Sequence, residues 1–237
     1  GNFIGTDATG KEAFGNKDAG IQIGGGASNN RIGGTNIVER NIISGNGAEG
    51  INFMGEEVNG NSVIGNYIGT DVSGTVNLGN KGIGVVIWVG AFNNLVERNL
   101  ISANKGPGVL IGDWGSSYNT VIGNLIGTDV TGTLAIQNAQ CGVFVGYMGA
   151  SFNRIGGTTT QERNIIGGIV GVDFCGPKAV GNMLLGNFIG TDVTGTRALG
   201  NNYHGVTVRD AHVFVGGLTE GEHNIINGNG GAGVSLS

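Results

Sequence analysis

Six ionisable side chains in the last third of the sequence lie outside any repeated pattern and have the types that acid–base chemistry uses. When neighbouring repeats are aligned, Asp173 lies beside Thr207, and Arg209 lies two residues further along the same face. An acid and a base would meet there, and such groups can transfer a proton to or from a bound molecule. The candidate catalytic residues are Asp173, Arg209, His212 and His204, with Lys178 and Asp210 nearby.

Aromatic residues gather in the middle of the chain. Both tryptophans and two of the four tyrosines lie between positions 88 and 147. Exposed rings next to polar side chains suit stacking on sugar rings, and they equally suit packing against a covering loop or a second molecule. The candidate ligand-binding residues are Trp88, Trp114, Phe144, Tyr147 and Asp113.

Four aspartates recur at one position of a repeat, which at first suggests a row of metal ligands: Asp7, Asp71, Asp129 and Asp192. They fall on every second coil of the fold argued below, about 9.6 Å apart, too far to share one ion without other ligands. We expect each carboxylate to cap its own loop through an Asx-turn. We expect no metal and no cofactor. Calcium stays an open alternative that the repeat does not indicate, because the Gly-Gly-x-Gly-x-Asp repeat of calcium-binding β-rolls is absent.

Three Glu-Arg pairs also recur at one place in the repeat, whereas catalysis would need a single copy. We expect them to anchor loops: Glu39–Arg40, Glu97–Arg98 and Glu162–Arg163.

The two cysteines lie at opposite ends of aligned strands. Cys141 precedes one strand and Cys175 ends the next, an offset of about 16 Å that exceeds disulfide reach. The sequence therefore predicts two unpaired thiols.

Composition excludes several classes of protein. Glycine supplies 51 of 237 residues but does not recur every third residue, so the chain is not collagen. The net charge is −5 and the 12 basic residues are scattered, which argues against a nucleic-acid partner. No apolar run approaches the roughly 18 residues that cross a bilayer, so we expect no membrane insertion.

A long internal repeat dominates the sequence. The hexapeptide Asn-x-Ile-Gly-Thr-Asp begins at Asn2, Asn66, Asn124 and Asn187, which defines a unit of about 62 residues. Each unit contains two copies of a tetrad, Gly-[Val/Ile]-x-[aliphatic or Phe]. The tetrads begin at Gly20, Gly50, Gly84, Gly108, Gly142, Gly171, Gly205 and Gly233. Eight tetrads imply about eight coils joined by loops of variable length.

Each coil contains three short segments that are rich in β-branched residues and bounded by Gly and Asn, which is typical of strands separated by tight corners. The pattern predicts an all-β fold, a right-handed parallel β-helix of about eight coils with three strands each. Aliphatic side chains would stack inward, and asparagines would stack at the corners. The middle outward-facing residues of the third strand, Val86, Leu110 and Phe144, are apolar.

The string Gly-Asn-x-Ile-Gly-Thr-Asp-x-x-Gly-Thr, with Asn-Arg-Ile-Gly-Gly-Thr, resembles the right-handed parallel β-helix repeats of large exported or surface-attached bacterial proteins. The similarity covers the whole chain, and the fold it implies is also that of pectate-lyase-like enzymes, phage tailspikes and adhesins. In such lyases a cation neutralises a sugar carboxylate and a base removes the adjacent proton, whereas related hydrolases use paired carboxylates. The resemblance implies an extracellular or cell-surface location.

These observations favour one domain over residues 1–237, interpreted as part of a longer repeat array. The expected function is a structural or adhesive rod with a carbohydrate-binding aromatic face, whose partner is a polysaccharide or cell-surface glycan. One alternative is a polysaccharide lyase or glycoside hydrolase that uses Asp173, Arg209 and His212. Another is a subunit that associates with itself, side by side or end to end, into a filament or surface layer.

Overall fold

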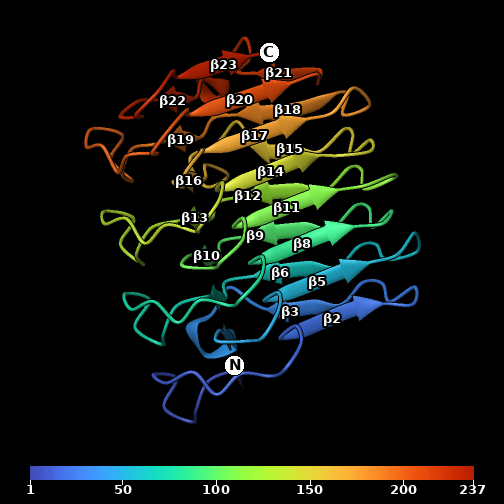
Figure 1. The fold of residues 1–237 in the computed structure, drawn as a ribbon, viewed down its shortest axis with the longest axis vertical. Coiled ribbons are helices and arrows are strands. Elements are labelled where there is room, and N and C mark those ends of the chain that lie inside the picture. The colour runs from blue at the N-terminus through green and yellow to red at the C-terminus, as the bar shows by residue number, and fades with distance from the viewer.

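The computed structural model describes residues 1–237 and contains 23 β-strands. Three strands, each from a different sheet, make one coil, and the coils stack along one axis from the N-terminal to the C-terminal end (Figure 1). Every strand pair within the sheets is parallel, and hydrogen-bonded neighbours are three strands apart in sequence order. The predicted fold, a right-handed parallel β-helix of about eight coils, is confirmed.

Sheet 1 consists of two-residue strands: β1 (Phe3–Ile4), β4 (Ile42–Ile43), β7 (Tyr67–Ile68), β10 (Leu100–Ile101), β13 (Leu125–Ile126), β16 (Ile165–Ile166), β19 (Phe188–Ile189) and β22 (Ile225–Ile226). Sheet 2 contains the predicted tetrads: β2 (Ile21–Gly24), β5 (Ile51–Met54), β8 (Val85–Trp88), β11 (Val109–Gly112), β14 (Val143–Gly146), β17 (Val172–Cys175), β20 (Val206–Arg209) and β23 (Val234–Leu236). Sheet 3 comprises β3 (Arg31–Gly33), β6 (Ser62–Ile64), β9 (Leu95–Glu97), β12 (Thr120–Ile122), β15 (Arg154–Gly156), β18 (Asn182–Leu185) and β21 (Val213–Val215).

The helical content is limited to two 3-10 turns, η1 (Ile37–Glu39) and η2 (Glu220–Glu222), each of three residues. The chain therefore has no helix that could cross a bilayer. Inside the coils, 27 buried apolar residues form one continuous core. The second residue of every strand in sheet 1 is isoleucine and points into this core, so identical side chains stack from coil to coil. Full burial of each such side chain contributes about 1.5–3 kcal/mol, which holds neighbouring coils together.

Asparagine ladders line the corners, as predicted. Ahead of sheet 1, each Asn side-chain amide donates to the Oδ1 atom of the next Asn at 2.8–3.2 Å. Similar ladders precede sheets 2 and 3. These bonds satisfy amides that the corner would otherwise bury without partners. The first ladder contains Asn2, Asn41, Asn66, Asn99, Asn124, Asn164, Asn187 and Asn224.

The repeated aspartates cap their own loops, which confirms the Asx-turn prediction. Asp129 accepts hydrogen bonds from the backbone N–H groups of Thr133 and Leu134, both at 3.0 Å, and from the Thr131 hydroxyl at 2.7 Å. Burial would raise the pKa of Asp129, but these hydrogen bonds lower it below its ordinary value. The same pattern recurs at Asp7, Asp71 and Asp192.

The capped loops cover the outer face of sheet 1. Successive loops bond to one another: Val130 N–H donates to the carbonyl of Gly74 at 3.0 Å, and two equivalent bonds join the other loops. Val130 also packs against an outward cluster of sheet 1 that contains Tyr67 and Leu100. The loops therefore bury an apolar face that would otherwise meet solvent.

Two of the three Glu-Arg pairs lie at loop anchors, and the third does not. Glu39 closes the turn η1 and pairs with Arg31 at 2.7 Å, and Glu162 pairs with Arg154 at 2.8 Å. Glu97 instead ends the strand β9 and pairs with its neighbour Arg98 at 3.3 Å. The anchor prediction is wrong for Glu97 because its coil has only a short connection to β10, with no loop to hold.

Candidate functional site

The outer face of sheet 2 carries an apolar stripe, and the corner residues Ile83 and Val170 pack against it. Val86, Leu110 and Phe144 point outward at adjacent register positions, yet only 1, 5 and 8 % of their surfaces are exposed. They form a cluster with Cys141, separate from the core inside the coils. Neighbouring side chains therefore shield this stripe from the sides, and the surface above it is hollowed.

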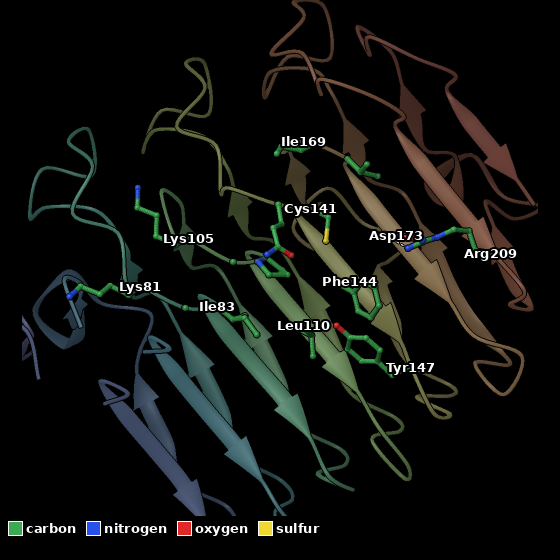
Figure 2. A pocket seen from close by; sticks show the side chains of 15 residues that line it. Lys81, Ile83, Lys105, Leu110, Cys141, Phe144, Tyr147, Ile169, Asp173 and Arg209 are labelled. Carbon is green, nitrogen blue, oxygen red and sulfur yellow. Dashed lines mark hydrogen bonds and ion pairs between the residues drawn. The ribbon is translucent and has the colours of Figure 1, made fainter. Parts of the chain in front are cut away.

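A first hollow of about 600 Å³ lies over this stripe, where the chain passes from sheet 1 into sheet 2. Leu110 and Phe144 form its floor. Figure 2 shows Lys81 and Lys105 at one end and the Asp173–Arg209 pair at the other. The hollow therefore runs along the axis of the rod, across several coils.

One corner beside this hollow is shorter than its counterparts. Five residue steps lead from Ile166 to Gly171, whereas seven lead from Ile101 to Gly108 in an equivalent corner. The missing residues include the ladder asparagine, and the Gly168 N–H donates in its place to Oδ1 of Asn201 at 2.7 Å. The shortened corner brings Ile169 and Val170 to the rim of the first hollow.

The structure brings Asp173 and Arg209 together. The Arg209 Nη2 atom lies 2.6 Å from Asp173 Oδ2, and 15 % of the Asp173 side chain is exposed. Burial raises the pKa of Asp173, and the guanidinium charge and hydrogen bond of Arg209 only partly oppose this. The second oxygen, Oδ1, is buried without a hydrogen-bond partner, as is Oγ1 of Thr207 at the paired register position. Two polar atoms at this end thus lack partners.

The histidines lie apart from this pair. His204 uses Nδ1 to accept a hydrogen bond from the Ala232 N–H at 2.9 Å, and it does not line the hollow. His212 follows β20, and its backbone N–H donates to the carbonyl of Ala179. It lines separate hollows near the C-terminal end of the rod. Of the four candidate catalytic residues, only two therefore share a site.

A second hollow of about 340 Å³ adjoins the first and contains three of the five candidate ligand-binding residues, Trp88, Asp113 and Tyr147. The two hollows share Tyr147 with Leu110 and Ile83, so we treat them as one depression and name it the sheet 2 groove. Phe144 lies on the floor of the first hollow. Glu49 is the remaining charged residue of the second hollow.

Aromatic rings form one side of the sheet 2 groove in fixed positions. The ring of Tyr147 lies 4.6 Å from that of Phe144 at an interplanar angle of 36°. The Trp88 indole N–H donates to Oδ1 of Asn52 at 3.0 Å, which fixes the ring orientation. Trp114, by contrast, is 62 % exposed outside both hollows, with the Lys178 ammonium 5.1 Å from its ring centre. The structure thus separates Trp114 from the other four candidate residues.

Backbone conformation marks the same coils. The residue that follows the strand has positive φ after seven of the eight strands of sheet 2, and in three of these cases it is a glycine, Gly25, Gly55 or Gly176. Four coils place another residue type there: Val89, Asp113, Tyr147 and Asp210, at φ +51° to +67°. Such backbone costs about 1–3 kcal/mol for a residue other than glycine, and it is often found at binding sites. Aligning this column of the repeat would have singled out these positions from the sequence.

Sequence reasoning missed two basic residues of the groove. Lys81 and Lys105 each follow a ladder asparagine, and each donates its backbone N–H to an asparagine carbonyl of the preceding coil, at 2.9 and 3.0 Å. They therefore occupy equivalent positions on successive coils, and both are exposed. Their position in the repeat does not set them apart, because Lys17 also follows a ladder asparagine, Asn16, and lies outside the groove.

The cysteines are unpaired, as predicted. Cys141 lines the first hollow and is buried, and burial raises the pKa of its thiol to about 12. It is therefore protonated at neutral pH and is a poor nucleophile. Its contribution is to pack in the apolar cluster that forms the floor.

The carboxylates of the groove are divided between its two hollows. The first contains Asp173 and the second contains Glu49 and Asp113, whereas a glycoside hydrolase needs two carboxylates facing each other across the scissile bond. No group of three or more His, Cys, Asp or Glu side chains is placed to hold a metal ion. What the groove offers is an aromatic side, an apolar floor and polar atoms at both ends. No protein-family model, no curated protein and no solved structure matches this chain.

Proposed function

We propose that this chain is a structural, adhesive rod of the bacterial cell surface or exterior that binds a glycan in the sheet 2 groove. The observation that carries the proposal is the placement of Trp88, Tyr147 and Phe144 around one uncovered depression, with charged and polar atoms at its ends. Sugar rings have apolar faces that stack on aromatic rings and hydroxyl groups that pair with such atoms.

The arrangement favours a long ligand that spans several coils. The groove crosses strands β8, β11, β14 and β17, whose spacing in the sheet is about 4.8 Å. A ligand in this position contacts several coils at once. Binding in this mode needs no mobile element, because Trp88 is already held by Asn52 and Tyr147 already packs on Phe144.

A glycan array probed with the purified chain tests this function, with the bound glycans then assayed for new reducing ends and unsaturated uronates. Trp88→Ala should weaken retention of the bound glycan about tenfold, because a stacked aromatic ring contributes roughly 0.5–1.5 kcal/mol beyond the area it buries. Trp114→Ala is the matched control, since Trp114 lies outside the groove. Equal losses in both variants, or no glycan binding at all, would contradict the proposal.

A polysaccharide lyase is the second candidate, and the Asp173–Arg209 pair is what favours it. Arg209 could neutralise a sugar carboxylate, and Asp173, whose pKa is raised by burial, lies beside it as a group that can exchange a proton. The expected partner His212 lines a different hollow, so a histidine base is missing from the groove. Product formation in the array assay that is lost in Asp173→Asn would favour the enzyme over the adhesive rod.

A further inference from the structure

The two hollows of the groove carry opposite charge. The first is lined by three basic residues, Lys81, Lys105 and Arg209, and by a single carboxylate, Asp173; Figure 2 shows the two lysine side chains extending outward from its edge. The second contains two carboxylates, Glu49 and Asp113, and no cation. The chain has a net charge of −5, so basic residues gathered in one hollow beside an acidic hollow are unusual on it. Such a separation of charge suits a ligand that has an anionic part and a neutral part.

The lysine charges are not used by the protein itself. None of the four ion pairs in the structure involves a lysine. Lys81 and Lys105 lie on adjacent coils, so their backbones are about 4.8 Å apart and their charges repel. The carboxylate of Asp173 is held by Arg209 and lies two coils beyond Lys105, which separates them by about 10 Å along the rod axis alone. An anionic group of a ligand would relieve this repulsion.

The second hollow selects against the same anionic group. Glu49 and Asp113 would repel a carboxylate or sulfate placed over Trp88, but they can accept hydrogen bonds from neutral hydroxyl and amide groups. An unbranched glycan in the groove passes over both hollows. It therefore needs an acidic sugar at one end and a neutral sugar at the other.

We propose that the groove recognises acidic heteropolysaccharides in which acidic and neutral sugars alternate, with the acidic unit over Lys81 and Lys105 and the neutral unit over Trp88. This specificity rests on the proposed glycan-binding function and sharpens it. A polymer with a carboxylate on every sugar is disfavoured by the second hollow. A neutral polymer leaves the two lysines without a partner.

Calorimetric titration of the full chain tests this specificity with three kinds of probe. Hyaluronan and heparosan oligosaccharides alternate uronic acid with an N-acetylhexosamine, oligogalacturonate carries a carboxylate on every sugar, and carboxyl-reduced hyaluronan is neutral. The alternating probes should bind about fivefold or more tightly than either of the others at low salt. High salt should remove most of this preference, because it shortens the Debye length from about 10 Å to about 3 Å.

Two double variants assign the preference to its residues. Lys81→Gln with Lys105→Gln should lower affinity for the alternating probes about fivefold and leave affinity for carboxyl-reduced hyaluronan unchanged. Lys11→Gln with Lys178→Gln removes the same charge outside the groove and is the control. Glu49→Gln with Asp113→Asn should improve oligogalacturonate binding, and asparagine tolerates the positive φ at position 113.

The outcomes distinguish a failure of the acidic specificity from a failure of the proposed glycan-binding function. Equal or tighter binding of carboxyl-reduced hyaluronan, or of any neutral glycan on the array, would overturn the acidic specificity while the glycan-binding function stands. Tighter binding of oligogalacturonate would overturn the alternation. Failure of every glycan to bind would overturn both proposals.

Discussion

At the scale of single residues, Asp173 is the most unusual side chain of the molecule. It occupies the outward position that is apolar on the three preceding coils, where Val86, Leu110 and Phe144 stand. A buried carboxylate is tolerated only when it is paired, and Arg209 supplies one partner for one of its two oxygens. The sequence repeat predicts that Asp173 lies beside Thr207 in the strand register, but it does not reveal that the Oδ1 atom of Asp173 is buried without a hydrogen-bond partner.

Replacing Arg209 by Met should destabilise the fold at neutral pH by about 1–3 kcal/mol, because it leaves the Asp173 carboxylate buried without a counterion. Burial already raises the pKa of Asp173, and the folded chain of this variant should take up its proton at still higher pH. A raised folded-state pKa means that folding favours the protonated form, so the loss should shrink as pH falls toward the ordinary carboxyl range.

Urea unfolding of the wild type and of Arg209→Met at neutral and acidic pH measures this dependence. Adding Asp173→Asn to Arg209→Met should restore most of the lost stability, since the uncompensated charge is then gone. A stability loss of the same size at both pH values would show that Arg209 contributes through packing, not through its charge.

At the scale of elements, different segments cover the outer faces of sheet 1 and sheet 2. The loops that contain the repeated aspartates fold over sheet 1, bond to one another and bury its outer face. The apolar outward cluster of sheet 2 instead packs against residues of the short corners, among them Ile83 and Val170. The hollows of the candidate site lie beside these corners.

Replacing Asp129 by Ala should destabilise the fold by about 1–2 kcal/mol at neutral pH, because two backbone N–H groups and the Thr131 hydroxyl lose their acceptor. Hydrogen bonding lowers the pKa of Asp129 in spite of its burial. This stabilisation is thus present above the ordinary carboxyl pKa and is lost as pH falls through the lower, folded-state pKa.

Denaturant unfolding at neutral pH and near pH 3 measures this stabilisation. The difference in free energy of unfolding between the wild type and Asp129→Ala should be smaller at the lower pH. Glu12→Ala is a fitting control, because Glu12 is an exposed carboxylate on an equivalent loop. If that difference in free energy of unfolding did not change with pH, the lost stability would come from the methylene and amide contacts of the loop instead of the carboxylate charge.

At the scale of the whole molecule, the repeat predicted nearly all of the fold and little of the site. The tetrads, the isoleucine stack and the asparagine ladders follow from local pattern, since each coil contacts only its neighbours. The site depends on departures from the repeat that have no pattern of their own. The shortened corner at Gly168 changes the rim of the hollow, and the lengths of the connections place His212 elsewhere. Lys81 and Lys105 were overlooked because charged residues after a turn are ordinary on any surface.

Because each coil packs only on its neighbours, we expect the loss of one ladder side chain to destabilise the adjacent coils and not the whole rod. Asn99 lies in the middle of the first ladder, where its side chain accepts from Asn66 and donates to Asn124 at 3.1 and 3.0 Å. Asn99→Ala should cost about 2–3 kcal/mol, because it leaves buried amide groups of the adjacent coils without partners. Hydrogen exchange followed by mass spectrometry should show lost protection in strands β7, β10 and β13, and unchanged protection in β19 and β20. Lost protection along the entire rod would instead mean that the coils unfold as a single cooperative unit, in which case the ladders couple distant parts of the groove as well as neighbouring coils.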